Sequence, residues 1–575
     1  MSHTAIDGLL LKEMIIAGAN LLEQNREIID SLNVFPVPDG DTGTNMSLTM
    51  KSTVKEIEVK DDPDASRILS VAAKGALKGA RGNSGVILSQ ILRGFSRGIE
   101  NSPAIDADAF VKGLRRGADT AYKAVMKPKE GTILTVIRVI AEDAARFNQK
   151  HPNDLQGLLE KVVTSGEAIL EKTPEMLPAL KQAGVVDSGG QGLLTVFRGW
   201  LAAFNGEHVA AVVESTADAS AVQEAAEEES ALTYRAEYVI CTLREDVTED
   251  DLNRLRTRLG RIGEGVSMEG DKPPIRVRLN TNYPGKAIQY ACDLGEIVEL
   301  SFENIAEKRR EKQRKAELEK RLQEQMKAEE ECRKKEEAEK EAAAEQPEEE
   351  PAEAFEKKPY GIVAVSIGEG FSKIFMDLGV DHIVEGGQTM NPSIEDIEDA
   401  IEKLHAETVF VLPNNSNVIL AATQAADLCD ENVVVIPTKN VAMGIGAVIA
   451  FNGEATPEEN QSSMTEAAEN VKTGQITFAV RDTVFEDKEI SEGDIIGIHN
   501  GRIEVVGTDI HDVAVELVNS VVEEDDSLIT VYYGQDTQQD QAETLSQEIA
   551  GLFPDKDVEV QYGGQPLYYY LISAE

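Results

Sequence analysis

The sequence is poor in cysteine and has no long apolar run. No uninterrupted apolar stretch is long enough to cross a bilayer. The N-terminal segment MSHTAIDGLLLKEMIIAGANLLEQN has no basic leader, and Lys12 and Glu13 break its apolar run; it predicts an amphipathic helix and not a secretory signal. The few cysteines are scattered, with no CxxC pair: Cys241, Cys292, Cys332 and Cys429. This spacing argues against a disulfide framework or a zinc ribbon, and we expect a cytoplasmic protein without a membrane span.

Basic residues are also in deficit. The chain has 57 Lys and Arg against 103 Asp and Glu, a formal net charge of -46. Such a surface repels phosphodiester backbones and anionic membranes, so nucleic acid is not expected as a partner. Hydrophobic residues make up 41% and charged residues 28%, which is ordinary for a folded protein. Because 575 residues exceed what one hydrophobic core supports, several domains are expected.

Residues 1–205 predict an all-α domain. Apolar residues recur at helical spacing in LLLKEMIIAGANLLEQN, GVILSQILRGFSRGI and TILTVIRVIAEDAARF, among others, and Gly, Asp, Ser or Thr clusters precede these segments. Roughly eight helices fit, which predicts a helical bundle or barrel.

The pattern changes twice in the middle of the chain. Residues 206–230 are acidic and rich in Ala and Ser, as expected of a linker. Residues 231–304 alternate strand-like and helix-like runs in the order βαββαβ, which predicts a small ferredoxin-like α/β domain. Residues 305–358 form a run of Glu, Lys, Ala and Arg without an apolar seam. We interpret this run as a charged helical or disordered insertion without chemistry.

Residues 359–575 predict an α/β domain that binds a partner. Short apolar runs such as YGIVAVSIGEG and TVFVLPNN end in Gly, Pro or Asn loops and alternate with helical stretches, which indicates an open sheet of mostly parallel strands. The tail from SLITVYYGQD onward adds a strand, helix and strand that could form a second lobe. The loops PNNSN (413–417) and PTKN (437–440) follow strands, where such sheets carry ligands, although ordinary loops look the same and are the favoured interpretation.

The stretch NVFPVPDGDTGTNM sets Asp39 and Asp41 on either side of one glycine. An EF-hand is excluded because Gly43, Thr44 and Met50 occupy positions that need other residues. What remains is an oxygen-rich turn before a helical run. Two carboxylates can hold Mg²⁺ while leaving positions for water and phosphate oxygens, and the helix N-terminus offers free N–H groups. Taken alone, the stretch is equally compatible with a turn and a helix N-cap.

A second segment, GALKGARGNSGVILSQ, spaces four glycines ahead of an amphipathic helix: Gly75, Gly79, Gly82 and Gly85. Glycines permit close approach of a phosphate, and Asn83 or Ser84 could cap the helix or bind the ligand. The segment matches neither a Walker A loop nor a Rossmann fingerprint. By itself it favours glycine-mediated helix packing.

Two further polar turns precede apolar helices, KPKEGTILTV around Gly131 and Thr132, and GVVDSGGQGLL around Asp187 to Gly190. Each is weak alone. Four such turns in one helical domain favour a binding function, because a bundle built only for packing can close its corners with less glycine.

These four motifs, with the α/β C-terminal region, resemble the DhaL-domain ATP-binding subunit of bacterial fatty-acid kinase, a relative of the nucleotide-binding subunit of dihydroxyacetone kinases that carries a DegV-like C-terminal region. The resemblance covers nearly the whole chain apart from the charged insertion. It implies an eight-helix barrel whose end loops bind ATP through magnesium. It also implies a separate fatty-acid-binding carrier of the DegV family and an acyl phosphate product used in phospholipid synthesis.

The resemblance further implies roles for individual residues. Asp39 and Asp41 would be catalytic and would ligate Mg²⁺, and Asn33 lies near where relatives supply another aspartate. The residues that would line the nucleotide are Thr42, Gly43, Thr44, Asn45, Asn83, Ser84, Gly131, Thr132, Asp187, Ser188 and Gly189. The γ-phosphoryl group would pass in line to a fatty-acid carboxylate. A carboxylate is already ionised near neutral pH, so no general base is needed, which fits the lack of histidine in these motifs.

One stretch departs from the family pattern. Family members often carry two histidines in a strand of the middle domain, and here VRLNTN places Arg278 and Asn280 at those positions. Arg cannot ligate a cation and Asn is a poor zinc ligand. We therefore expect no zinc, and we expect Cys241 to be a buried core thiol.

Two alternatives remain. The first is a kinase for a small hydroxy-ketone such as dihydroxyacetone, which the lack of a recognisable substrate-holding domain disfavours. The second is a non-catalytic nucleotide-binding scaffold whose α/β region binds partners. A homodimer is compatible with each of these hypotheses.

Overall fold

The computed structural model describes residues 4–34, 40–58, 60–211, 234–244, 247–270, 274–304, 357–387, 391–479, 483–485, 488–491, 493–500 and 502–575. The described residues up to 211 and from 357 onward form one compact unit, and those from 234 to 304 belong to a second. Most of the predicted linker and nearly all of the charged insertion lie outside the described residues, so both stay predictions.

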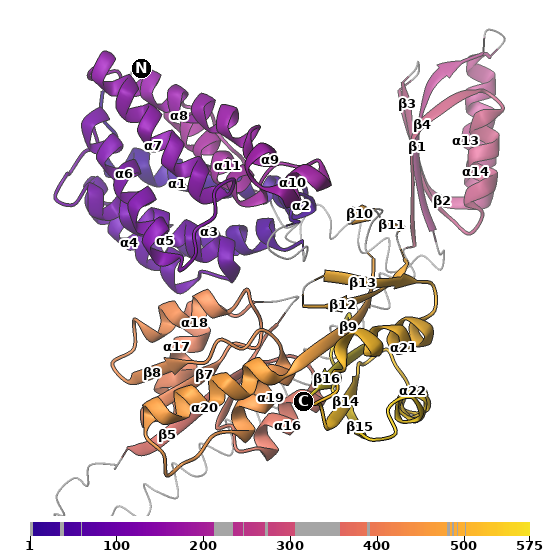
Figure 1. Ribbon diagram of the computed structural model, residues 1–575. Helices are drawn as coiled ribbons and strands as arrows, with labels where there is room; N and C mark the ends of the chain where they lie inside the picture. Colours follow the sequence, from indigo (N-terminus) through magenta and orange to yellow (C-terminus); the bar gives the residue numbers. More distant parts are fainter. Residues whose placement is uncertain are drawn as a thin grey trace, which may run out of the picture. The chain divides into compact units, whose positions relative to one another are not determined.

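The N-terminal region is helical, as the sequence predicts (Figure 1). Its described part contains eight helices of at least fourteen residues: α1 (Gly8–Gln24), α3 (Thr42–Glu58), α4 (Ala65–Lys78), α5 (Gly82–Gly98), α6 (Ala107–Ala124), α7 (Ile133–Lys150), α8 (Leu155–Leu170) and α11 (Ser188–Phe204). Three short helices connect them: α2 (Arg26–Ser31), α9 (Thr173–Met176) and α10 (Pro178–Ala183). From α3 to α8 each long helix contacts the next, α11 contacts α8, and α1 contacts both α11 and α3.

Aspartates start most of these helices. A side-chain oxygen of the aspartate before the helix accepts a hydrogen bond from a backbone N–H of the first turn, which satisfies a donor that has no partner within the helix. The aspartates in this position are Asp7, Asp64, Asp106, Asp154 and Asp187, ahead of α1, α4, α6, α8 and α11. This local chemistry explains why helix starts can be predicted from the sequence.

Aromatic side chains and small residues share the helical core. The buried ring of Trp200 makes edge contacts with Phe95, Phe110 and Phe197, with centroids 5.4 to 6.4 Å apart. Nearby, Gly199 of α11 lies against Gly18 of α1, where a β-carbon would meet backbone. The ring of Trp200 therefore packs where α1 and α11 approach closely at these two glycines.

The chain after α11 turns back onto α1. The side chain of Asn20 donates to the carbonyl of Val209 at 3.0 Å, and Gln24 donates to the carbonyl of Ala210 at 2.8 Å. The first described residues of the predicted linker are thus held against the helical domain.

The middle unit has the predicted element order: β1 (Tyr234–Leu243), α13 (Glu249–Ile262), β2 (Gly263–Glu269), β3 (Ile275–Thr281), α14 (Pro284–Cys292) and β4 (Gly295–Asn304). Its antiparallel sheet has the strand order β2-β3-β1-β4. On β3, Ile275, Val277 and Leu279 are buried and alternate with more exposed residues, as expected for a sheet with one covered face.

The prediction that Cys241 is a buried core thiol is wrong. Cys241 is only partly buried. Tyr238 and Ile240 of the same strand are buried in the core of the unit, whereas Cys241 stands at a register shift between β1 and β4, where the regular alternation of the strand is interrupted. Its thiol lies 3.4 Å from the carbonyl of Glu296.

The first part of the C-terminal region is a parallel sheet in the order β6-β5-β7-β8, with helices between the strands. The elements are β5 (Lys358–Ser366), α16 (Glu369–Asp377), β6 (His382–Glu385), α17 (Ile394–Glu402), β7 (Ala406–Leu412), α18 (Ile419–Ala426), β8 (Asn432–Val435), α19 (Val441–Ile449) and α20 (Pro457–Asn470). β5 is buried on both faces: Ile362 and Ala364 belong to one core cluster, and Val363 and Val365 to another. This double burial explains the continuous apolar run in the sequence.

The second part is a separate six-stranded sheet in the order β13-β12-β9-β16-β14-β15. Its elements are β9 (Lys472–Phe478), β12 (Ile495–His499), β13 (Arg502–Gly507), α21 (Ile510–Val521), β14 (Leu528–Tyr533), α22 (Gln539–Leu552), β15 (Asp557–Tyr562) and β16 (Tyr570–Ala574), and a small pair, β10 (Thr483–Phe485) and β11 (Lys488–Ile490), stands apart. Only the pair β14 and β15 is parallel among the described strands of this sheet. The prediction of mostly parallel strands is therefore correct for the first sheet and wrong for the second.

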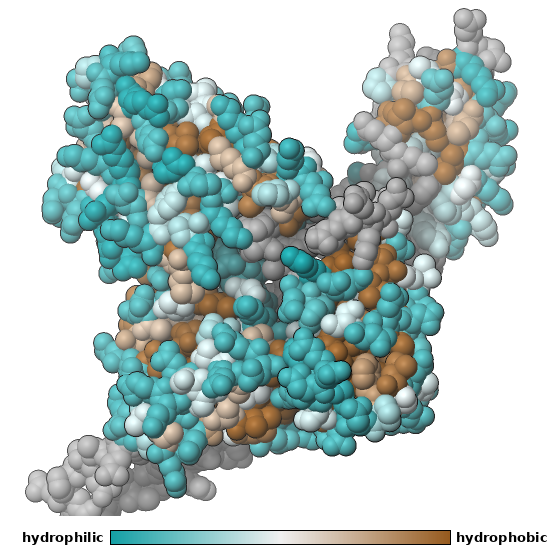
Figure 2. Space-filling model, in the orientation of Figure 1, coloured by the Kyte–Doolittle hydropathy of each residue, from teal (hydrophilic) through white to brown (hydrophobic). Residues whose placement is uncertain are grey.

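Within the described ranges, no helix is long and apolar enough to span a membrane. On the face drawn in Figure 2, hydrophilic side chains cover most of the helical domain, in keeping with the high content of Asp and Glu.

Candidate functional site

The first motif forms the start of α3. Asp41 directly precedes the helix, and its backbone carbonyl accepts a hydrogen bond from the N–H of Asn45 at 2.8 Å. Thr42 and Asn45 are buried, and Asp41 is partly buried. Asp39 lies outside the described residues, so the paired carboxylates stay a prediction.

The glycine-rich second motif brings the start of α5 onto the start of α3. Gly82 has a φ of +57°, and a β-carbon there would overlap the side chain of Asn45. A β-carbon at Gly85 would overlap Thr49 of α3. Arg81 is the residue that precedes α5, so Asn83 and Ser84 lie in its first turn and neither of them caps the helix. The capping role suggested for these two residues is therefore wrong.

The last motif brings the start of α11 to the same place. The hydroxyl of Ser188 lies 3.2 Å from the hydroxyl of Thr42. Both residues are buried, and both stand in the first turn of their helix. One turn further on, Gly192 of α11 packs against Met46 of α3.

Asp187 links the start of α11 to the start of α7. Its carboxylate accepts the backbone N–H of Gly190 at 2.7 Å and the backbone N–H of Ile133. Ile133 is the first residue of α7 and directly follows Gly131 and Thr132 of the third motif. Asp187 thus serves two helix N-termini at once.

The four motifs are therefore joined in one chain of contacts, from α5 to α3 to α11 to α7. At every one of these contacts the helix presents its N-terminal end, where backbone N–H groups lack a partner within the helix and the helix dipole is positive. Several N-termini that converge in this way favour the binding of an anion such as a phosphate group.

Burial gives Asp187 an unusual acidity. The side chain is 6% exposed, and desolvation raises its pKa to about 7, although the hydrogen bonds from Gly190 and Ile133 act in the opposite direction. The carboxyl is therefore partly protonated near neutral pH, and its charge depends on the same helix ends that could hold a ligand.

The other predicted site residues have structural partners. Thr44 donates its hydroxyl to Asp30 at 2.8 Å, and Thr132 donates its hydroxyl to the carbonyl of Lys129 at 2.8 Å. Asn33 is buried, and its backbone N–H donates to the carbonyl of Asp30. The predicted nucleotide role of these residues stays a prediction.

Gly131 and Gly189 are the two glycines of the third and fourth motifs that were predicted to line the nucleotide. Gly131 has a φ of +83° and donates its N–H to the hydroxyl of Thr135 at 2.8 Å, while Gly189 packs against the side chain of Ile133. Both glycines therefore belong to the joined ends of α7 and α11.

Sequence reasoning missed two residues at this site. Asp30 binds both the N–H and the hydroxyl of Thr44, and so holds the first turn of α3. Asn391, just before α17, donates its amide N–H to Asp41 Oδ2 at 2.7 Å, and Arg81 donates to its carbonyl at 2.8 Å. A separation of 350 residues between Asn391 and Asp41 leaves no local signal in the sequence.

The second motif also contacts the C-terminal region through other side chains. Asn83 donates to the side-chain oxygen of Asn417 at 2.7 Å, and Gln90 donates to Gln424 at 2.7 Å. Lys78 forms an ion pair with Glu395 at 3.0 Å. The end of α4 and the start of α5 are thus held by polar contacts to residues around α17 and α18.

The donor set at Asp41 suits a hard cation. Across the described positions, no group of three or more His, Cys, Asp or Glu side chains could hold a metal ion. Mg²⁺ needs fewer protein ligands, because it is commonly held by one or two carboxylates together with water and phosphate oxygens. Asp41 supplies one carboxylate beside the converging helix N-termini, so the residues fit this ion and not an all-protein cage.

Family comparisons agree with this architecture. The helical region matches the DAK2 domain over residues 36–202, which defines a multi-domain protein with a DAK2-type helical domain followed by α/β sheets. The later regions match two domains of the FakA-like fatty acid kinase family, the middle domain over residues 231–312 and the C-terminal domain over residues 361–575. The chain belongs to this FakA-like family, which confirms the resemblance inferred from the motifs.

Full-length relatives support this assignment. Protein YloV of Bacillus subtilis is 42% identical over 589 residues and covers all of both chains. An uncharacterized protein of Staphylococcus aureus is 38% identical over 576 residues and covers 99% of each chain. Among solved structures, the fatty acid kinase B3 protein of Streptococcus pneumoniae, loaded with linoleic acid, is 13% identical. It covers 38% of this chain and 99% of that chain at a TM-score of 0.28, which is too low to establish more than a remote likeness.

Proposed function

We propose that this chain is the ATP- and Mg²⁺-dependent component of a fatty-acid kinase. It would transfer the γ-phosphoryl group of ATP to the carboxylate of a fatty acid that a separate lipid-binding protein of the DegV family delivers. The observation that carries this proposal is the convergence of four helix N-termini beside Asp41. Membership of the FakA-like fatty acid kinase family supports the choice of substrate.

The first turns of α3, α5, α7 and α11 would bind the triphosphate. Their backbone N–H groups are fixed before the ligand arrives, because Asp30, Asp187 and the glycine contacts hold the helix ends in place. Preorganised donors of this kind are the main means by which phosphoryl-transfer sites stabilise spread negative charge. Asp39 and Asp41, with Asn33 nearby, would hold Mg²⁺, which when bound neutralises charge on the phosphate oxygens.

The reaction needs no base from the protein. A carboxylate oxygen of the fatty acid attacks the γ-phosphorus, the bond between that phosphorus and the β,γ-bridging oxygen breaks, and ADP leaves with the bonding electron pair. The products are an acyl phosphate and ADP, and no proton is transferred. The fatty acid is ionised near neutral pH, which agrees with the absence of histidine from the four motifs.

Three further proposals concern the location of the protein, the architecture of its helical domain and the metal content of its middle domain. The acyl phosphate would supply phospholipid synthesis, and we propose a cytoplasmic location for the protein. We propose an eight-helix barrel for the DAK2-type domain, supported by the contacts between successive long helices. We also propose that the middle domain binds no zinc, because Arg278 and Asn280 stand where family members often have histidines.

Turnover in a defined mixture tests the proposal. The full-length chain, a DegV-family lipid carrier, oleate and Mg·ATP are combined, and acyl phosphate is trapped with hydroxylamine while ADP is measured. We expect ADP and acyl hydroxamate in equal amounts, and only when the carrier and the chain are both present. The matched variant is Asp39→Asn with Asp41→Asn, which keeps the size of both side chains and removes both charges.

Each alternative has its own outcome in this assay. ADP formed from dihydroxyacetone without carrier and oleate would favour the hydroxy-ketone kinase. Mg·ATP binding without any turnover would favour the nucleotide-binding scaffold. Unchanged turnover in the double variant would show that the opening loop is only a turn.

A further inference from the structure

The loop between α6 and α7 carries an exposed methionine next to the candidate site. Met126 is 82% exposed, and the residues from 126 to 130 are all exposed. The loop leads into Gly131 and Thr132 of the third motif, and so into the start of α7. A single exposed apolar side chain is common on folded proteins and needs no explanation. The surroundings of Met126 therefore decide its meaning.

Hydrogen bonds close the base of this loop. Tyr122, in the last turn of α6, donates its hydroxyl to Glu130 Oε1 at 2.9 Å. Glu130 Oε2 accepts the hydroxyl of Thr135 at 2.6 Å and pairs with Arg138 at 2.7 Å. The loop is thus tied to α6 and to the first two turns of α7. These ties keep Met126 at one place on the surface, although its side chain gains no burial there.

A second exposed methionine borders the same loop. Met176, the last residue of the short helix α9, is 41% exposed, and a β-carbon at Gly131 would overlap its side chain. At the other end of α9, the hydroxyl of Thr173 accepts the backbone N–H of Asp187 at 3.1 Å. One end of α9 is therefore fixed to the third motif and the other to the fourth. We call Met126 and Met176 the methionine rim, because they border the converging helix N-termini.

Lysines surround Met126. Lys123, Lys127 and Lys129 are exposed, and the sequence from 120 to 129 contains no acidic residue. In a chain with a net charge of -46, such a stretch attracts anionic partners that most of the molecule repels. Apolar side chains flanked by charges are typical of interfaces with an apolar centre and a polar edge.

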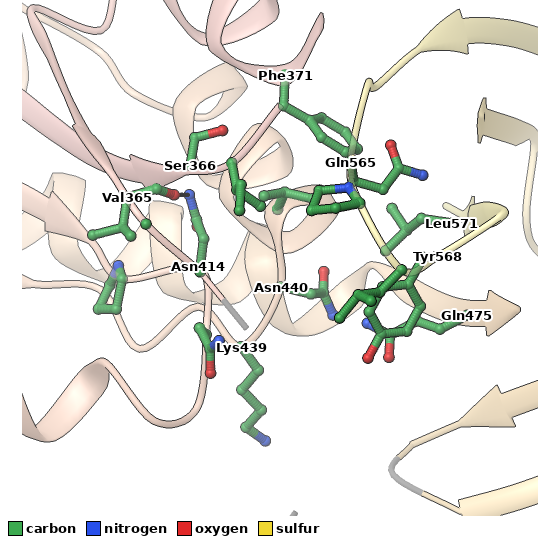
Figure 3. A pocket seen from close by; sticks show the side chains of 18 residues that line it. Val365, Ser366, Phe371, Asn414, Lys439, Asn440, Gln475, Gln565, Tyr568 and Leu571 are labelled. Atoms are coloured by element: carbon green, nitrogen blue, oxygen red, sulfur yellow. Dashed lines mark hydrogen bonds between the residues drawn. The ribbon is translucent and has the colours of Figure 1, made fainter. Parts of the chain in front are cut away.

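The proposed reaction limits what can contact this surface. A long acyl chain does not fit the pocket drawn in Figure 3, whose enclosed space of about 60 Å³ is below the roughly 150 Å³ of a cavity known to hold benzene. In-line attack requires the fatty-acid carboxylate within about 3.5 Å of the γ-phosphorus. The molecule that carries the fatty acid must therefore contact the surface around the helix N-termini, and the methionine rim belongs to that surface.

We infer that the methionine rim, together with Lys127, is the docking surface for the loaded lipid carrier, an inference that rests on the function proposed above. The face of the carrier is apolar around the opening that presents the fatty-acid carboxylate, and it bears acidic side chains opposite the lysines. Methionine suits such a surface because its flexible thioether adapts to the shape of a partner. An anionic membrane also attracts apolar and basic side chains. The position of the rim beside the site favours the partner that brings the acceptor to the phosphate.

The carrier dependence of turnover tests the docking surface in the full-length chain. Met126→Gln combined with Met176→Gln keeps the length of both side chains and makes them polar. Initial rates are measured against the concentration of an oleate-loaded DegV-family carrier at saturating Mg·ATP. We expect the half-saturating carrier concentration to rise by roughly ten-fold or more, because two apolar side chains lose their burial in the complex. The Kd of Mg·ATP, measured by calorimetry without carrier, should stay within about two-fold.

Each change has a matched control at the far end of the helical domain. Leu9 is 47% exposed and lies in the first turn of α1, where Gly8 contacts Pro63 beyond the end of α3. Leu9→Gln should leave the carrier dependence unchanged. Lys127→Gln should raise the half-saturating carrier concentration by roughly two- to five-fold at low ionic strength and by less at high ionic strength. Lys150→Gln should have no effect, since the exposed Lys150 ends α7, about 27 Å from the start of that helix.

Direct binding of the loaded carrier, followed by sedimentation velocity, separates this inference from the function on which it rests. Weaker carrier binding by the double variant than by the wild-type chain supports the docking surface, even if the mixture makes no acyl phosphate. That absence of product would overturn the proposed function alone. A wild-type chain that neither binds the carrier nor turns over would overturn both.

Three results would overturn the docking surface while leaving the proposed function intact. The first is turnover with an unchanged half-saturating carrier concentration in the double variant. The second is Mg·ATP binding that is weakened roughly ten-fold, which would assign the two methionines to the nucleotide. The third is wild-type binding to vesicles of equal parts phosphatidylglycerol and phosphatidylcholine that the double variant loses, which would assign them to a membrane.

Discussion

Asp41 is the residue on which the candidate site depends, and its contact with Asn391 can be tested by substitution. In this structure its Oδ2 atom accepts a hydrogen bond from Asn391. A metal ion bound to the same carboxylate would draw on the negative charge that this donor now stabilises. The amide of Asn391 therefore competes with the cation that we propose for the site.

Asn391→Ala tests this competition. We expect Mg·ATP affinity to rise by roughly three- to ten-fold, since the substitution removes a hydrogen bond that competes with the cation for the charge of the carboxylate. Calorimetric titration measures the change. Asn519→Ala, at an exposed asparagine of α21, should leave the affinity unchanged. A lower affinity in Asn391→Ala would show that Asn391 supports the bound state instead.

Asp187 gives a second test at the scale of one residue, through pH. Its pKa of about 7 lies above the ordinary value of 3.8, so between these values the folded chain retains a proton that the unfolded chain releases. The free energy of unfolding must therefore fall as pH rises from about 4 to 7. From pH 5 to pH 8 we expect this group to contribute a loss of roughly 2 to 3 kcal/mol.

Asp187→Asn should flatten that dependence. Urea unfolding followed by the fluorescence of Trp200, the one tryptophan of the sequence, measures the free energy at both pH values. Asparagine does not titrate, so the difference between pH 5 and pH 8 should shrink whatever the constant cost of the substitution. An unchanged difference would mean that another group causes the pH dependence.

Single residues show where sequence reasoning succeeds. Asp187 is predictable at a helix start because its side chain caps the apolar helix that follows it directly in the sequence. Asn391 is not, because its partner Asp41 is distant in the sequence. The prediction for Cys241 fails because this residue stands at a register shift between β1 and β4, which the sequence pattern around it does not reveal.

At the scale of elements, the close approach of α1 and α11 supports the position of the site. A β-carbon at Gly199 would meet the backbone of Ala17 and Gly18. The start of α11 carries Asp187 and Ser188, so the packing of its body fixes where those residues lie. Strain introduced at Gly199 must therefore either separate the helices or shift the site.

Gly199→Ala should lower the free energy of unfolding of the helical domain by roughly 1 to 3 kcal/mol, measured by urea denaturation with Trp200 fluorescence. Gly551→Ala is the matched control in α22, since nothing lies within 4 Å of the position of its β-carbon. At position 551 alanine has a better helix propensity than glycine, so the substitution should raise the free energy of unfolding by up to about 1 kcal/mol. Equal effects of the two changes would contradict the importance of the α1 and α11 contact.

The helices and strands also show which elements can be predicted from the apolar pattern of the sequence. Helices of the N-terminal domain and the parallel strands β5 and β7 are predictable because burial on a defined face leaves a periodic or continuous apolar pattern. The antiparallel pair β12 and β13 escapes the prediction, although Asn500 followed by glycine at its turn is a strong hairpin signal, and Asn500 has a φ of +51°. The error arises from extending the βα pattern of the first sheet into the second.

At the scale of the whole molecule, the chain divides into two compact units, and only one of them contains the candidate site. A ligand that binds the folded state alone stabilises the unit to which it binds. The middle domain should therefore not respond to nucleotide.

Hydrogen exchange with and without Mg·ATP measures both units in one sample. At a concentration of about one hundred times Kd we expect added protection in the helical domain equivalent to roughly 2.7 kcal/mol. Peptides within residues 234–304 should exchange at unchanged rates. Protection of the middle domain alone would show that the nucleotide binds there, and would contradict a site in the helical domain.

The most direct test is a crystal structure of the full chain with Mg²⁺ and a non-hydrolysable ATP analogue. The proposal predicts phosphate oxygens within hydrogen-bond distance of backbone N–H groups in the first turns of at least two of α3, α5, α7 and α11, with the cation bound to Asp41. A triphosphate bound elsewhere, or bound at these helix ends with the carboxylate of Asp41 directed away from the cation, would contradict it.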